Sequence, residues 1–137
     1  MELPEDVTWW PDFRLFAWKP RGVLDEKAVN RIIKFLGNQE ATDETPFNRF
    51  TDLSVLDAVE LNFNFVFHVA LYRRLSYMGR PPIKSAFFVT SPEVAHFVRL
   101  HSMLTDHSPL RVGVFEKRQR AAKWLEVPID LIGRASS

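Results

Sequence analysis

The segment Thr51-Asp-Leu-Ser-Val-Leu-Asp57 decides the fold expected for this chain. It continues the aromatic and apolar run 47–53, which is typical of a strand, and leads into the long apolar stretch 60–78. Residues 61–67 alternate like a strand, but the stretch runs unbroken to the Gly-Arg-Pro-Pro sequence at 79–82, and this length favours a helix. We therefore expect a strand that turns directly into a helix at this segment.

Similar patterns predict strands and helices in alternation along the rest of the chain. Gly37 is a natural stop for one helix, and Ser91 before proline is a strong start for another. The expected strands are 13–18, 47–53, 83–89 and 110–115, and the expected helices are 24–36, 60–78, 92–107 and 118–127. This order predicts helices around a mostly parallel sheet, with loops that begin at Asp52, Thr90 and Glu116 on one edge.

The length of 137 residues suits one domain that closes a single core. We expect an N-terminal arm at 1–11, an α/β domain at 12–128 and a C-terminal tail at 129–137. Two tryptophans in the arm are expected to pin it to the body of the protein or to a second subunit. The end of the tail, residues 133–137, is expected to fray.

Composition and charge exclude several classes of protein. Hydrophobic residues make up 46% of the chain and charged residues 26%, and the formal net charge of +1 provides no field that would attract nucleic acid or an anionic membrane. The absence of cysteine excludes disulfides, thiolate metal sites and cysteine nucleophiles, and it fits a cytoplasmic protein. The longest apolar stretch, 63–71, is too short to span a bilayer.

Three motifs carry a resemblance to a known family. They are Arg21-Gly-Val-Leu-Asp25, Phe50-Thr-Asp-Leu-Ser-Val-Leu-Asp57, and Val114-Phe115 followed by Ala121-Ala-Lys-Trp-Leu125. Their order and spacing resemble the SpoIIAA-like, or STAS, fold of anti-sigma-factor antagonists and of the cytoplasmic domains of sulfate transporters, in particular the uncharacterised branch labelled STAS/SEC14-like. The resemblance implies a single α/β domain with a four- to five-stranded, mostly parallel sheet and about four helices.

The resemblance also implies what the central segment does in the family. Antagonists of this fold have an Asp-Leu-Ser-like strand end, then an aspartate followed by paired serines at the start of the next helix, and a partner kinase phosphorylates one serine. Asp52, Ser54 and Asp57 match this frame, but Ala58 and Val59 occupy the serine positions. Neither side chain has a hydroxyl, so we expect the phosphoserine switch to be absent.

Two groups of polar residues are candidate contacts. Asp52, Ser54 and Asp57 form a candidate binding surface at the strand-to-helix edge, and the competing interpretation, favoured by residue preference, is that they cap the next helix. Lys117 and Arg118 lie at a helix start, where positive charge is not stabilised by the helix dipole. They are therefore candidate contacts for an anion, with an ordinary solvated face as the alternative.

The aromatic residues Phe63, Phe65 and Phe67 are further candidates for the binding surface. Side chains two residues apart on a helix point in different directions, so one apolar face does not account for all three. We favour a dimer interface over a small-molecule pocket for them, with burial in the core as the strongest competing interpretation.

Motifs for catalysis and metal binding are absent from the sequence. There is no Gly-x-Ser-x-Gly and no glycine-rich phosphate loop, and His96 and His101 are five residues apart rather than three or four. We expect no catalytic residue, metal or cofactor. The expected function is a non-enzymatic, cytoplasmic STAS-like interaction or regulatory module, a homodimer with an unknown protein partner. The alternative is a binder of a small apolar or lipid-like ligand, and an enzyme that uses the carboxylate edge is a third hypothesis.

Overall fold

The computed structural model describes residues 2–133, and the last residues of the expected tail, 134–137, lie outside this range. A five-stranded sheet has the order β1-β2-β4-β6-β7, and a separate two-stranded sheet pairs β3 with β5. The elements are β1 (Val7–Trp10), η1 (Pro11–Phe13), β2 (Leu15–Trp18), β3 (Gly22–Asp25), α1 (Glu26–Thr42), β4 (Asn48–Asp52), β5 (Leu56–Glu60), α2 (Phe63–Ser76), β6 (Ile83–Phe88), α3 (Pro92–Leu104), β7 (Leu110–Phe115), α4 (Arg118–Leu125) and η2 (Ile129–Ile132).

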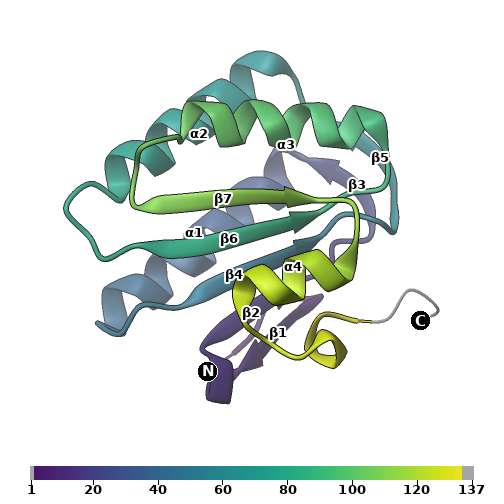
Figure 1. Cartoon of the computed structure of the whole chain (residues 1–137). Helices are drawn as coiled ribbons and strands as arrows, with labels where there is room; N and C mark the ends of the chain where they lie inside the picture. Colours follow the sequence, from purple (N-terminus) through teal and green to yellow (C-terminus); the bar gives the residue numbers. More distant parts are fainter. Residues whose placement is uncertain (1, 134–137) are drawn as a thin grey trace.

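The helices lie on both faces of the main sheet (Figure 1). Strands β2, β4, β6 and β7 are parallel and succeed one another in one direction across the sheet. Right-handed crossovers in a constant direction put every connecting helix on the same face, which is where α1, α2 and α3 lie. The last helix, α4, follows the final strand and packs with η2 against the opposite face. The expected mostly parallel α/β sheet with four helices is confirmed.

Successive side chains along each strand point alternately to the two faces of the sheet. In β4, Phe50 belongs to the core cluster beneath α4, whereas its neighbours Arg49 and Thr51 face the cavity on the helix side. In β6, Ala86 packs toward α4 and Phe87 toward α3. The period of two in a pleated strand therefore builds two cores, one on each face of a single sheet.

The prediction of an N-terminal arm at 1–11 is wrong for residues 7–10, which join the sheet, but Trp9 does pack on the body of the protein as expected. Val7–Trp10 forms β1, an antiparallel edge strand on β2, and the rings of Trp9 and Phe16 lie 4.3 Å apart. The short β1 uses the free edge of β2, and the burial of Val7 helps to fix it there. At the other end, η2 is not part of a loose tail, because Ile132 is buried in the core under α4.

A second correction concerns the central segment, where a strand was expected to turn directly into a helix. Residues Leu56–Glu60 form β5 instead, which pairs in parallel with β3. The α2 helix begins only at Phe63, and the side chain of Asn62 caps it by accepting a hydrogen bond from the Phe65 amide at 2.8 Å. The extended backbone of β5 finds its partner in Gly22–Asp25, a contact between segments far apart in the chain, which local periodicity does not report.

The first helix also differs from its expected range of 24–36. Leu24 belongs to β3, and Asp25 is the N-cap of α1, with its carboxylate 2.9 Å from the Ala28 amide. The helix continues through Gly37 to Thr42. A glycine inside a helix costs only about 1 kcal/mol, and the added residues bring Glu40 to Arg49 of β4 and to Tyr77 at the C-cap of α2. None of the helices in residues 2–133 combines the length and apolar character needed to span a bilayer.

Candidate functional site

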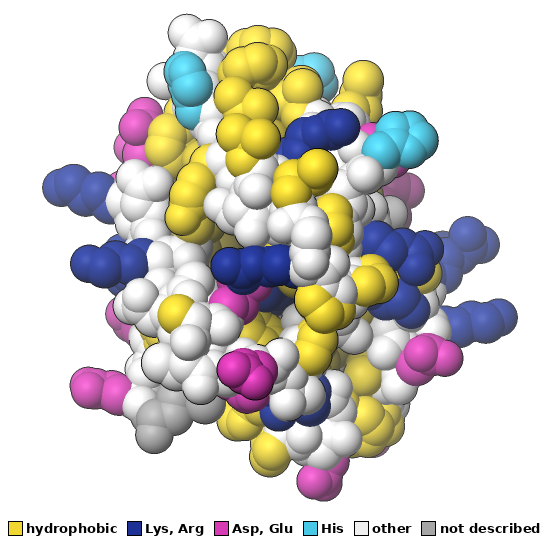
Figure 2. All heavy atoms as spheres, turned by 90° about the vertical axis from the view of Figure 1, so that its left-hand side faces the viewer, with side chains coloured by type: hydrophobic (Ala, Val, Ile, Leu, Met, Phe, Trp, Pro, Cys, Tyr) yellow, Lys and Arg dark blue, Asp and Glu magenta, His cyan; other side chains and the backbone are white. Residues whose placement is uncertain are grey.

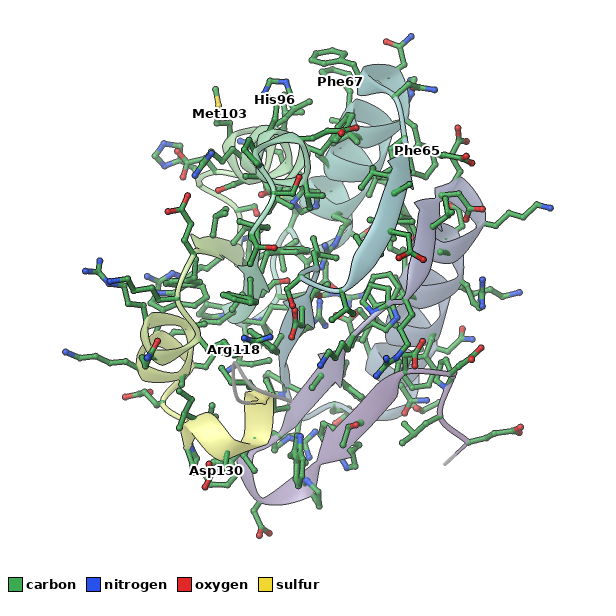
Figure 3. The ribbon with its side chains drawn as sticks, turned by 90° about the vertical axis from the view of Figure 1, so that its right-hand side faces the viewer. Phe65, Phe67, His96, Met103, Arg118 and Asp130 are labelled. Carbon is green, nitrogen blue, oxygen red and sulfur yellow. The ribbon has the colours of Figure 1, made fainter. Side chains whose placement is uncertain are left out.

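The sheet edge expected from the sequence brings together three of the candidate residues. Asp52 Oδ1 accepts hydrogen bonds from the Ser54 amide at 2.9 Å and the Ser54 hydroxyl at 2.6 Å, and Asp52 Oδ2 lies 3.0 Å from Arg118 Nη2. The same guanidinium lies over the ring of Phe88. Asp52 and Arg118 therefore neutralise each other and fasten α4 to the end of β4 (Figure 3 labels Arg118 beside α4).

The other polar candidates stay apart from this cluster. Asp57 is exposed on β5, and Lys117 is exposed at the N-cap position of α4. The capping interpretation for Asp52, Ser54 and Asp57 is wrong, because Asn62 caps α2. A role for this edge in binding a partner or an anion stays a prediction.

The three phenylalanines of α2 separate into two environments. Phe63 and Phe67 are 56% and 39% exposed, so burial in the core does not account for them. Phe65 is half-buried on the side of α2 that faces α1 and lines the cavity described next, whereas Phe67 points away from the sheet (Figure 3). The expected divergence of these side chains is therefore confirmed.

A cavity of about 110 Å³ lies between the helix-side face of the sheet and α1, α2 and α3. Its walls are mostly apolar and include Trp18, Ile33, Phe65, Val69, Val94 and Val98. The α2 helix packs closely on α3 but not on α1, and a groove of about 710 Å³ runs between α1 and α2. Ile33, Phe65, Val69 and Arg73 line both spaces, so the groove leads to the cavity.

One end of the cavity is polar. Arg49 and Ser85 are paired neighbours on β4 and β6, near the end of the sheet where the parallel strands begin. Arg73 of α2 and His101 of α3 lie in the C-terminal halves of their helices and line the same space. In a parallel α/β arrangement the helices run back against the strands, so these four residues meet at one end. Figure 2 looks onto the beginning of the strands, where basic and acidic side chains border a hollow near the centre.

The charges at this end are only partly compensated. Arg49 Nη1 donates to the Tyr77 hydroxyl at 2.6 Å, and that hydroxyl donates to Glu40 Oε1 at 2.7 Å. Glu40 Oε2 lies 3.4 Å from Arg49 and 3.4 Å from Arg80. Arg73 forms no ion pair with any carboxylate of residues 2–133, and its Nη1 lies 3.3 Å from His101 Nε2.

Burial shifts the acid–base properties of this pair. Desolvation, together with the positive charge of Arg73, lowers the pKa of His101 to about 3. Desolvation and the nearby Arg49 lower the pKa of Arg73 to about 10, so this guanidinium is still charged at neutral pH. Neutral His101 therefore accepts the Arg73 hydrogen bond at Nε2 and carries its proton on Nδ1, a buried atom without a partner among the described residues.

The polar residues of this site, Arg49, Arg73 and His101, were not expected from the sequence, although Phe65, which lines the cavity, was a candidate. The sequence of β4 did contain a signal. Arg49 and Thr51 alternate with Phe50 and so lie on the opposite face of a central strand, where an arginine is unusual. The basic pair Arg73-Arg74 fits a helix end equally well, and only the fold shows that Arg73 turns inward while Arg74 binds the backbone carbonyls of Leu104 and Asp106. Residues 2–133 contain no group of three potential metal ligands.

The geometry defines an α/β protein with a mostly parallel sheet and a helix-side cavity. Its fold is SpoIIAA-like, as expected: it is similar to a crystal structure of an uncharacterized protein of the DUF3478 family with a SpoIIAA-like fold from Shewanella loihica PV-4. The two share 17% sequence identity with a TM-score of 0.51, over 81% of this chain and 83% of the other. No family model matches this sequence, and neither does any curated protein.

Proposed function

We propose that this protein is a non-enzymatic binding protein that holds a small apolar ligand between the sheet and α1, α2 and α3. The cavity of about 110 Å³ is the observation that supports this proposal most. Protein interiors have few voids larger than a water molecule, and an engineered apolar cavity of about 150 Å³ binds benzene. The space here is smaller, so it suits a small ring or a short hydrocarbon chain, and the groove between α1 and α2 provides an entrance and room for the rest of a longer ligand.

Native mass spectrometry of freshly purified protein tests this proposal, with co-purifying mass as the expected result. Isothermal titration with eight-carbon probes is the second test. Val69→Trp places an indole where the groove meets the cavity and should abolish binding, whereas Leu71→Trp, on the exposed side of the same helix, should leave it unchanged. A consistently empty protein that also fails to bind neutral or charged eight-carbon probes would refute the proposal.

A homodimer is the second candidate, and a stripe on α2 favours it. Phe63, Phe67, Leu71 and Leu75 recur every four residues and are 56%, 39%, 44% and 65% exposed. The stripe itself carries no charge, so two copies of α2 would pack through it across a twofold axis without placing like charges within the stripe. Exposed apolar surface of this kind marks protein interfaces.

Size-exclusion chromatography with light scattering tests the dimer. We expect a dimer at micromolar concentrations and a monomer after Phe67→Ser combined with Leu71→Ser. The matched control replaces two exposed residues outside the stripe, Val23→Ser and Met103→Ser, and should leave the dimer intact. A monomeric wild-type protein across this range would exclude the homodimer without affecting the ligand proposal.

A further inference from the structure

The polar end of the cavity holds more positive charge and more donors than its own residues compensate. Arg49 and Arg73 are 3% and 8% exposed, and Glu40 is the one carboxylate of residues 2–133 that pairs with either of them. Exposed Arg80 shares that carboxylate. Arg49 Nε and His101 Nδ1 are buried without a hydrogen-bond acceptor in the described chain, and Arg49 Nη2 has only the 3.4 Å contact with Glu40 Oε2. A buried donor without an acceptor costs free energy, so a ligand that brings acceptors here is favoured.

The placement of Arg73 makes it the contact for such a ligand. Glu40 and Tyr77 stabilise the charge of both guanidinium groups, but Arg73 is the one that lines both the cavity and the entrance groove. His101 accepts a hydrogen bond from one amino group of Arg73. It adds no charge to the site, because the pKa of His101 lies far below neutral pH. The guanidinium is thus oriented and desolvated before a ligand arrives, which strengthens its attraction for an anion.

The rest of the cavity is suited to hydrocarbon. Beyond Thr51 and Phe87, toward the end of the sheet where the strands stop, the lining consists of residues such as Leu24, Leu53 and Val94. The space therefore has one polar end at the beginning of the strands and an apolar body toward their carboxyl ends. This polarity matches a ligand with one charged end and an apolar remainder.

We infer that the ligand is an amphiphile with a single carboxylate, bound by Arg73 beside Arg49, and a short hydrocarbon body within the apolar walls. This inference rests on the proposed function. The two buried guanidinium groups exceed the single negative charge of Glu40, which exposed Arg80 also shares, so an anionic head group is favoured here. A planar guanidinium also pairs with a carboxylate through two parallel hydrogen bonds.

The test compares octanoate, 1-octanol and octylammonium, which share one chain and differ in the head group, by titration at neutral pH. Octanoate should bind at least about tenfold more tightly than octanol, and octylammonium should bind most weakly. Arg73→Gln should reduce octanoate to the affinity of octanol. Lys34→Gln removes an exposed cation from the mouth of the same groove and should leave the preference intact.

The outcomes separate this inference from the function on which it rests. Equal affinity for octanoate and octanol would refute the inference of a carboxylate ligand but not the proposal that the cavity binds an apolar ligand. No binding of any probe would refute both. Loss of the preference in Lys34→Gln, with retention in Arg73→Gln, would assign it to surface charge and overturn the role of Arg73. If Arg73→Gln does not fold, the comparison of the three head groups on the wild-type protein still tests whether the ligand carries a carboxylate.

Discussion

Acid is expected to destabilise this protein through His101. The folded protein keeps the ring neutral with a pKa of about 3, because the ring is buried beside Arg73, against an ordinary value of 6.5. Below pH 6.5 the unfolded chain therefore binds a proton that the folded chain does not. Stability rises with pH wherever the unfolded state binds more protons, so the free energy of unfolding falls as the pH drops from 6.5 toward 3.

The magnitude follows from the two pKa values. One unit of pKa difference corresponds to about 1.4 kcal/mol, so His101 alone is expected to remove about 2 kcal/mol between pH 7.5 and pH 5. For a chain of this size that loss lowers the melting temperature by about 6 °C. The remaining loss, to roughly 5 kcal/mol, follows as the pH approaches 3.

Urea unfolding, monitored by tryptophan fluorescence between pH 7.5 and pH 5, measures this loss. His101→Gln removes the titrating ring and should flatten the pH dependence, whereas His96→Gln, exposed on the same helix, should not. Carboxylates titrate in all three proteins, so the difference between them isolates His101. Equal slopes for the wild type and His101→Gln would refute the reasoning, as would an imidazole NMR signal of wild-type His101 that titrates near pH 6.5.

Three further substitutions, two of them with a matched control, test the charge pairs and the packing of the two faces by urea denaturation. Glu40→Gln removes the carboxylate that compensates buried guanidinium charge and should lower the free energy of unfolding by about 3 kcal/mol. Asp52→Asn leaves the α4 guanidinium without its counter-ion and should cost about 3 kcal/mol, whereas exposed Asp57→Asn should change stability by less than about 0.5 kcal/mol. Gly113→Ala puts a methyl group 2.7 Å from a phenylalanine ring and should destabilise by about 1–2 kcal/mol, whereas Gly37→Ala meets nothing within 4 Å in α1 and should stabilise by about 0.5–1 kcal/mol.

For each of these substitutions, one result would contradict the expected effect on stability. A neutral effect of Glu40→Gln would mean that Arg49 and Arg73 reach water. Equal effects of the two aspartate substitutions would remove the distinction between the buried pair and the exposed strand. Stabilisation by Gly113→Ala would mean that the rings of Phe115 and Trp124 move aside without cost.

The strands β4, β6 and β7 and the helices α2, α3 and α4 were predictable because each carries a complete local pattern. The start of α3 at Pro92 is an example, since proline there needs no tertiary partner. The β3–β5 pair and the edge strand β1 were not predictable, because a strand is stabilised by the segment that it meets, and these partners are distant in the sequence. The extension of α1 to Thr42 depends in the same way on where Glu40 ends up.

The sequence by itself determined the alternation of the main parallel strands and helices, the mostly parallel sheet and the absence of hydroxyls at Ala58 and Val59, because these depend on residue type and local spacing. Only the tertiary structure decided which charges are used and where. It paired Asp52 with Arg118 across the sheet edge, and it placed Arg73 and His101 over Arg49 at one end of an apolar cavity. The physical reason is that burial and charge compensation are properties of several elements packed together, whereas periodicity describes one element at a time.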